Sequence, residues 1–414
     1  MSVLTTTEPR CDTGRDSPPG RISTARGRMI SGPLALVFLF EFSALTSFYL
    51  LLSVMPMYAA AAGAGSAGAG LVTGGLLLGS VIAELAAPIL MRRYGHPALL
   101  VAGGLLLGVP ALALLPGGPL VVIVTVSVVR GFGFGLGTVI TGALTAVLLP
   151  PKRRGEGLGL FGVVATAPGV VALPAGVWLA GHCGIAMVAG MAAATALVPV
   201  AAFPWLPGRT GRHTAQERAD TGQPDGLLAG LRHAGQLRPF LIFAASTVAA
   251  GVVVSFLPLA AGVSGNVAAA GLLVQALAAT ISRWWAGRQG DRNGHARLLA
   301  PALVISSLGM IAMIWLTTPA AVIAGMCLFG TGFGISQNAT FALMIDRMPA
   351  SGFGTASALW SLAYDGGYGA GPAVFGLFVS HTGYPASFAL TGALMLAALP
   401  SARREQSTAA IAPG

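Results

Sequence analysis

Four charged residues interrupt long apolar stretches of this sequence, and they are the first candidates for chemistry: Glu41, Glu84, Arg130 and Asp365. A charge is costly to place among apolar groups, and where a sequence keeps one it usually marks a path for an ion, a proton or a substrate. Glu84 lies nearest to the end of its stretch. For Glu84 we expect a structural hydrogen bond near the adjoining loop.

Glu41 and Arg130 are the candidates for handling protons. Glu41 lies between Phe40 and Phe42, about eight residues into the first apolar stretch. Removal of its carboxyl group from water disfavours the charged form, which suits a proton carrier. Arg130 lies more than ten residues from either end of the fourth stretch. The alternatives are structural: Glu41 is bonded to a hydroxyl or a water, and Arg130 is neutralised by a neighbour.

Asp365 follows Trp360 and Tyr364 in the eleventh apolar stretch. Trp360 and Tyr364 are four residues apart and share a helix face, with Asp365 about 100° from Tyr364. Rings for stacking and one acid for charge are typical of the wall of a binding cavity; the alternative is an aromatic patch between helices. Gln275 and Asn338, in the eighth and tenth stretches, either line the same cavity or bond across helices.

The elements that position these residues must be membrane-spanning helices. Of 414 residues, 55% are hydrophobic and 9% are charged, and the mean hydropathy is +0.79, whereas soluble domains are about 25% charged. A span needs about 20 residues, so the chain has room for about twelve. We place the spans at residues 33–58, 67–91, 97–115, 119–148, 157–180, 185–206, 238–262, 266–286, 298–317, 320–346, 354–379 and 385–400.

The basic residues indicate how these spans are oriented. With twelve spans, 22 of the 23 Lys and Arg fall in the two tails and in alternate loops, and Arg130 is the remaining one. Because cytoplasmic loops carry the excess of basic residues, we expect a multi-pass protein of the inner cell membrane with both termini in the cytoplasm. The expected divisions are a disordered cytoplasmic tail (1–32), an N-terminal six-helix half (33–206), a cytoplasmic linker (207–237), a C-terminal six-helix half (238–400) and a cytoplasmic tail (401–414).

The two halves repeat each other. Arg92–Leu100 aligns with Asp291–Leu299 at a fixed offset in residue number (291 − 92). The same offset aligns Gly131–Gly135 with Gly330–Gly334. A constant offset over this length indicates a duplicated unit, which is how many transporters are built around a central site. The sequence therefore predicts an all-α fold of two six-helix pseudo-repeats around a central cavity.

Two motifs resemble signatures of the major facilitator superfamily. Residues 287–295 match the loop signature G-x-x-x-D-R-x-G, a charged turn between two spans, and Arg130 begins a partial match to the R-x-x-x-G motif of the fourth helix, with Phe134 in place of Gly. The resemblance implies an Arg that faces the central cavity and is linked to proton coupling and, in its drug/proton antiporters, an acid in the first helix. The loop-motif residues are Gly287, Asp291, Arg292 and Gly294.

Other classes of function lack their motifs. No G-x-x-x-x-G-K-[ST] loop is present, so ATP is not expected as the energy source. Cys11, Cys183 and Cys327 have no ligand spacing, so we expect neither a disulfide nor a metal site. No nucleophile–base pair is evident, and we expect neither an enzyme nor a cofactor. The basic residues behind the net charge of +10 lie where cytoplasmic tails and loops are expected, so nucleic acid is not an expected partner.

The resemblance favours the bacterial drug and metabolite efflux branch. We expect export of a small, partly apolar organic compound in exchange for protons, by a monomer in the lipid bilayer. Glu41 would exchange protons, Arg130 would tune that exchange, and Asp365 with Trp360 and Tyr364 would contact the substrate. One alternative is a proton-coupled importer of a sugar or organic acid, which would need more polar groups in the cavity. Another is a transport-inactive sensor or scaffold, against which the intramembrane charges count.

Overall fold

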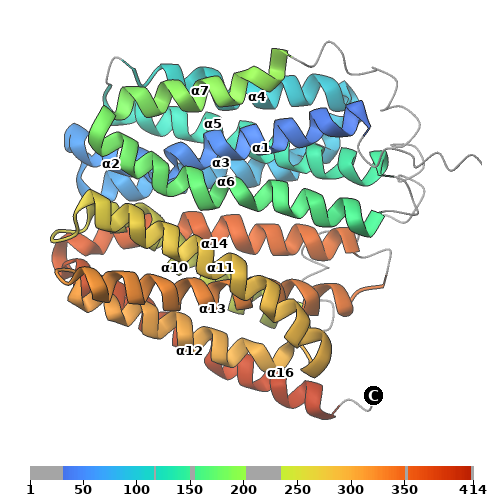
Figure 1. The fold of residues 1–414 in the computed structure, drawn as a ribbon, viewed down its shortest axis with the longest axis vertical. Helices are drawn as coiled ribbons and strands as arrows, with labels where there is room; N and C mark the ends of the chain where they lie inside the picture. The colour runs from blue at the N-terminus through green and yellow to red at the C-terminus, as the bar shows by residue number, and fades with distance from the viewer. Residues whose placement is uncertain (1–30, 116–117, 150–153, 202–234, 350–352, 412–414) are drawn as a thin grey trace, which may run out of the picture.

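A computed structural model of the chain describes residues 31–115, 118–149, 154–201, 235–349 and 353–411. Every regular element within these ranges is a helix (Figure 1), so the all-α prediction is confirmed for them. The expected tail at 1–32 and the expected linker at 207–237 lie almost entirely outside the described residues.

The helices form two groups that follow each other in the chain. The N-terminal group comprises α1 (Gly32–Leu52), α2 (Val54–Ala59), the short π-helix η1 (Ala60–Ala64), α3 (Gly65–Tyr94), α4 (His96–Leu112), α5 (Leu120–Leu148), α6 (Arg154–Cys183) and α7 (Ile185–Ala201). The C-terminal group comprises α10 (Leu237–Phe256), η4 (Leu257–Leu259), α11 (Gly265–Asn293), α12 (Ala296–Ala312), η5 (Met313–Trp315), α13 (Pro319–Asp346), α14 (Phe353–Thr382), α15 (Tyr384–Leu396) and α16 (Leu399–Ile411).

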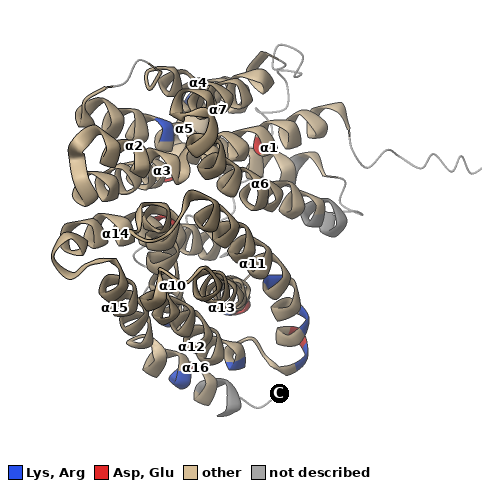
Figure 2. Cartoon of the chain, turned by 60° about the vertical axis from the view of Figure 1, so that its left-hand side comes forward, with Lys and Arg blue, Asp and Glu red and all other residues tan. Residues whose placement is uncertain are grey.

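The two groups lie side by side, the blue-to-green one above the yellow-to-red one in Figure 1. Two helix pairs make most of the contact between them: α3 packs on α14, and α6 packs on α11. Charged positions are sparse inside the bundle and gather near the ends of α11, α12 and α16 (Figure 2). This distribution is expected of helices whose middle portions lie in a bilayer.

Eight helical segments of the described chain are long and apolar enough to cross a membrane. The first runs for 63 residues, Gly32–Tyr94. As one straight helix it would be about 95 Å long, roughly three times the thickness of the hydrocarbon core. It instead folds back on itself after α2, at Gly63 and Gly65, whose φ angles are 85° and 60°. The count of twelve spans in two halves stays a prediction.

Turns recur in the two groups at the spacing predicted from the sequence. Glycine suits such turns because positive φ is strained for side chains with a Cβ. Three pairs of positive-φ glycines are separated by the same offset as the sequence repeat (294 − 95 for the second pair): Gly63 and Gly262, Gly95 and Gly294, and Gly184 and Gly383.

Close helix contacts recur at the same offset. A Cβ on Gly131 of α5 would lie 1.7 Å from the Leu76 carbonyl oxygen of α3. A Cβ on Gly330 of α13 would lie 2.3 Å from the Gln275 carbonyl oxygen of α11. Gly330 and Gln275 are the repeat equivalents of Gly131 and Leu76. Because these glycines let two backbones touch, they set how α3 meets α5 and how α11 meets α13.

The loop motif is mostly helical, which corrects the prediction of a charged turn over residues 287–295. Helix α11 continues through Gly287, Asp291 and Arg292 and ends at Asn293. Within the motif only Gly294 has a positive φ, of 86°, and its N–H bonds the Gly290 carbonyl over 2.8 Å. Asp291 pairs with His295 at 3.5 Å. Polar residues here extend the helix past its apolar part, and a glycine directly after the helix ends it.

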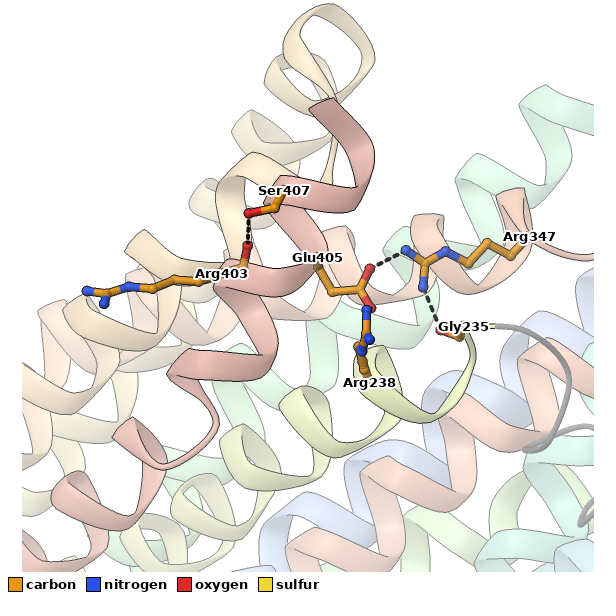
Figure 3. A network of polar contacts seen from close by, with 6 residues as sticks. All are labelled: Gly235, Arg238, Arg347, Arg403, Glu405 and Ser407. Atoms are coloured by element: carbon orange, nitrogen blue, oxygen red, sulfur yellow. Dashed lines mark hydrogen bonds and ion pairs between the residues drawn. The ribbon is translucent and has the colours of Figure 1, made fainter. Parts of the chain in front are cut away.

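The expected tail at 401–414 is helical up to residue 411, as α16, and is tied to the C-terminal group (Figure 3). Glu405 is 1% exposed and accepts a hydrogen bond from Arg347, at the end of α13. Arg347 also donates to the Gly235 carbonyl, and Arg238 of α10 lies 3.8 Å from Glu405. A buried carboxylate with two cationic neighbours therefore holds α16 against α10 and α13.

Candidate functional site

A small cavity lies where α1, α3 and α5 of the N-terminal group meet α14 of the C-terminal group. Its volume is about 30 Å³, which is room for one or two water molecules. Aromatic rings form most of the wall, and Asp365 is the acid in it. The lining residues are Phe48, Tyr49, Leu52, Leu77, Phe134, Tyr364, Asp365 and Tyr368.

Asp365 connects the two helix groups. It is 6% exposed, and Ser80 Oγ of α3 donates to its Oδ2 over 2.7 Å. Glu84, one turn further along α3, interacts with Asp365 as well. Ser80 and Glu84 face the same acid because residues i and i+4 share a helix face. Glu84 therefore faces an acid of the other group rather than the adjoining loop.

The rings around Asp365 are arranged in two stacks. Tyr364 and Tyr368 stack along α14 with centroids 5.6 Å apart. Phe48 of α1 and Phe134 of α5 stack with centroids 3.8 Å apart. Tyr49 of α1 and Tyr364 of α14 line the same cavity, so the two groups also meet through phenol side chains.

Trp360 lies outside the cavity wall, although it shares a face of α14 with Tyr364. Its ring stacks on Phe243 of α10 at 4.5 Å, and its Nε1 donates to Thr340 Oγ1 of α13 over 3.3 Å. In this conformation Trp360 therefore packs α14 onto α10 and α13. The structure joins Tyr364 to Asp365 in one cavity but does not add Trp360 to it.

Gln275 and Asn338 are also absent from the cavity wall. Gln275 is 7% exposed and lies on α11 where Gly330 of α13 approaches its backbone. The Asn338 side chain of α13 faces Gly287 of α11: a Cβ at Gly287 would lie 3.4 Å from Asn338 Nδ2. Both residues thus lie at the contact between α11 and α13.

Arg130 is buried and binds backbone carbonyls. It is 1% exposed, and its guanidinium donates to the Leu107 carbonyl of α4 and, over 3.0 Å, to the Ser47 carbonyl of α1. No carboxylate pairs with it among the described residues. Arg130 therefore ties α5 to α1 and α4, and it is not part of the cavity wall.

Among the described residues, Glu41 has one hydrogen-bond partner. It is 4% exposed, and Thr141 Oγ1 of α5 donates to its Oε2 over 2.5 Å. Thr141 and Arg130 are eleven residues apart on α5 (141 − 130), or roughly 16 Å along the helix axis. The structure therefore does not bring together the two residues predicted to couple protons.

The sequence did not assign the rings of Phe48, Tyr49, Phe134 and Tyr368 to the cavity wall. It also did not assign the nearby polar residues Ser80, Glu84 and Arg283 to the cavity. Ser80 and Glu84 are polar residues one turn apart in an apolar helix, and this spacing was the available signal. Arg283 of α11 interacts electrostatically with Tyr49 and Tyr364. It is the repeat equivalent of Glu84, so corresponding positions of the two groups carry opposite charges.

Comparison with known families gives one match over most of the chain. Residues 37–372 match the family model described as Major Facilitator Superfamily.

Solved transporter structures share this fold at low sequence identity. A D-xylose–proton symporter is 16% identical, with a TM-score of 0.68 over 89% of this chain and 95% of its own. A bacterial homolog of the human lysosomal transporter Spinster, in an inward-facing and occupied conformation, is 14% identical, with a TM-score of 0.70 over 91% and 96%. A peptide transporter in complex with sulfate is 15% identical, with a TM-score of 0.71 over 91% and 94%. At these identities the likeness concerns the fold alone.

Proposed function

Because the chain belongs to the major facilitator superfamily, we propose that it exports a small, partly apolar organic compound, an antibiotic or a metabolite, in exchange for protons. The observation that carries this proposal is the aromatic cavity with Asp365 between the two helix groups. Membrane transporters of this kind move a substrate by rocking one half against the other around a fixed central site.

The cavity wall favours an apolar or cationic substrate. Tyr364, Tyr368 and Phe48 offer ring faces, which attract organic cations and stack on flat apolar groups. Asp365 supplies one negative charge and would repel an organic acid. The wall offers few further polar groups, whereas a sugar site needs many hydrogen-bond partners. These features support the exporter over the importer of sugars or organic acids.

The cavity, of about 30 Å³, is too small for such a substrate, so transport requires the two helix groups to separate. In the proposed cycle the twelve spans act as two six-helix halves, 33–206 and 238–400. Glu41 exchanges protons inside the first half, and Arg130 supports that half by tying α5 to α1 and α4. Trp360, Gln275 and Asn338 would reach the substrate only in a more open state.

The distribution of charged residues indicates how the chain would lie in the membrane. The charged helix ends around α11, α12 and α16 would face the cytoplasm, with both termini on the same side of the inner membrane. In the loop motif, Gly287 gives room to Asn338, while Asp291, Arg292 and Gly294 end α11 at the membrane surface. The transporter would act as a monomer, and its partners would be the substrate, protons and lipid.

Proton movement in inside-out membrane vesicles tests the proposal. Lipophilic cations, neutral antibiotics and sugars are added in turn to vesicles with an acidic lumen that contain the wild type, Glu41→Gln or Asp346→Asn. Asp346, an exposed acid at the end of α13, provides the matched control. Export in exchange for protons predicts proton efflux on adding a lipophilic compound, retained in the control and lost in Glu41→Gln.

Other outcomes would separate the alternatives. A response to sugars or organic acids alone would replace the exporter with the importer. A full response in Glu41→Gln would remove Glu41 from the proton path. No response to any compound, with the protein correctly inserted, would reject export of this substrate class.

A further inference from the structure

We propose that Glu84 and Asp365 form a shared proton-binding site between the two helix groups, which holds one proton while α3 and α14 are closed on each other and loses it when they separate. This inference rests on the proposed function and deepens it, because it adds to Glu41 a second proton-binding site, one that adjoins the cavity. It rests on the contacts of the two acids, on the packing around them and on the charges nearby.

The two acids lie side by side at the contact between α3 and α14. Asp365 accepts a hydrogen bond from Ser80 at Oδ2, and Glu84, one turn further along the same face of α3, interacts with Asp365. Two ionised carboxylates carry no proton, so a hydrogen bond between Glu84 and Asp365 would require that one of them is protonated. Two buried carboxyl groups at one site do not both ionise, because their charges repel.

No ion pair compensates the two acids among the described residues. In the described part of the chain, the ion pairs involve Glu405 and Asp291, and neither Glu84 nor Asp365 takes part in one. The charged and titratable groups around the pair come from α1, α11 and α14: Tyr49, Arg283, Tyr364 and Tyr368, with Glu41 further along α1. Arg283 interacts with Tyr49 and Tyr364 rather than with the acid pair. A bound proton would therefore supply the positive charge that offsets one of the two carboxylates.

Tight packing between α3 and α14 surrounds the two acids. We call this contact the α3–α14 seam. It comprises Ser66, Gly70, Gly74, Leu77 and Ser80 of α3 and Asp365, Gly369, Pro372 and Gly376 of α14. Ser66 Oγ donates to the Gly376 carbonyl over 2.9 Å. A Cβ on Gly70 would lie 2.2 Å from the Pro372 carbonyl oxygen. Because the two backbones touch along the seam, two ionised carboxylates could not move apart while α3 and α14 stay packed. Ionisation of both acids would therefore separate the two helices.

The other contact between the two groups, α6 on α11, carries different residues at the equivalent positions. At the offset of the sequence repeat, Glu84 corresponds to Arg283 and Asp365 corresponds to Thr166. Thr166 bonds only to carbonyls of its own helix in the described structure. Among the described residues the α6–α11 contact has no equivalent acid pair, so the proposed proton site belongs to the α3–α14 seam alone.

The site also explains how a substrate could replace the proton. Asp365 is part of the cavity wall as well as of the acid pair. A cationic compound that enters the cavity and pairs with Asp365 would favour the ionised form of both acids, and the shared proton would leave. Binding of substrate and binding of the proton would then exclude each other, which is the requirement for exchange.

The first test is infrared difference spectroscopy of the purified full-length protein during a pH change, without substrate. The wild type should show a protonated-carboxyl C=O band that is lost in Glu84→Gln and equally in Asp365→Asn. In each variant an amide can donate to the remaining carboxylate, so no proton is needed. Glu41→Gln should keep the band. Persistence of the band in either pair variant would overturn the shared site, because the proton would belong to one acid or to another group.

The second test measures the distance between spin labels at Ala62 and His381, two exposed positions beyond the Ser66–Gly376 end of the seam. The labels are placed in a protein whose Cys11, Cys183 and Cys327 are replaced by Ser. Because the closed state binds one more proton than the open state, the closed-to-open ratio should fall as pH rises, by about tenfold per pH unit within the titration range. Glu84→Gln should stay closed, with less than a twofold change per unit.

A tenfold response that survives in Glu84→Gln would place the proton elsewhere and overturn the inference. Both tests use neither substrate nor a proton gradient. A protein that passes them but exports no compound would refute the proposed function and leave the proton site standing. A protein that exports compounds but fails both tests would refute the proton site and leave the proposed function standing.

Discussion

Replacing Gly70 by Ala is expected to open the α3–α14 seam. The added Cβ would lie 2.2 Å from the Pro372 carbonyl oxygen and 3.0 Å from its carbon, whereas ordinary contact begins at 3.4 Å. The helices would have to separate locally until the contact with the oxygen lengthens from 2.2 Å to 3.4 Å. The obstacle is a main-chain group, so a change of side-chain rotamer cannot relieve it.

The size of the effect follows from the cost of overpacking. An extra methyl group in a tightly packed site costs about 1–3 kcal/mol. If that cost falls on the closed state alone, the closed-to-open ratio should fall by a factor of about 5 to 150. Gly131→Ala makes a useful comparison, because its Cβ would meet Leu76 within the N-terminal group at 1.7 Å. That variant should lower the melting temperature and leave the ratio nearly unchanged.

The assay combines the spin-label distance at Ala62 and His381 with thermal unfolding of the same samples. Gly142→Ala is the matched control, because a Cβ there meets no atom within 4 Å. Gly70→Ala should move the distance distribution while lowering the melting temperature less than Gly131→Ala does. If Gly70→Ala leaves the distances unchanged and destabilises the protein as much as Gly131→Ala, then α3 and α14 are a fixed contact and the reasoning about a moving seam is wrong.

Three further predictions concern the buried polar groups. Arg130→Gln should destabilise the protein by about 1.5–3 kcal/mol through lost charged hydrogen bonds, measured by thermal unfolding; an unchanged melting temperature would show that the carbonyls find other donors. Glu405→Gln should weaken the ion pair with Arg347 and cost about 1–3 kcal/mol, less than a fully buried pair because the arginine is partly exposed; equal protease resistance of variant and wild type would contradict this. Thr141→Val removes the hydrogen-bond partner of Glu41 and should change substrate-driven proton efflux about 2- to 10-fold, whereas unaltered efflux would count against Glu41 as the carrier.

Hydropathy and the internal repeat predicted much of the fold. Apolar stretches locate helices well because a bilayer requires about 20 apolar residues per span. The constant offset between the repeats also anticipated where turns recur, as Gly95 and Gly294 illustrate. The ends of α11 and of the last helix were harder to predict. A polar segment indicates that the chain has left the lipid, but it does not indicate whether the helix has ended. The polar ends of both helices were therefore predicted to be loops.

The candidate site was predicted only in part. An acid in an apolar stretch pointed to Asp365, and helix geometry placed Tyr364 near it. The partner of Asp365 could not be predicted, because Glu84 lies in the other half of the chain and only the packing of α3 on α14 brings them together. Glu84 looked like a residue at a helix end because it is close to the last turns of its stretch. The distance of Arg130 from Glu41 likewise depends on which faces of α1 and α5 meet.

The position of Glu405 in the chain has a consequence for the timing of synthesis. Helices α10 and α13 are made before α16, so Arg347 is in place before its acidic partner exists. A nascent chain that stops short of residue 405 would leave this arginine without its acid, at the face of the C-terminal group that α16 covers. Helices α10 and α13 would then lack the contact that holds α16 against them, so this face of the C-terminal group can close only after residue 405 has been made.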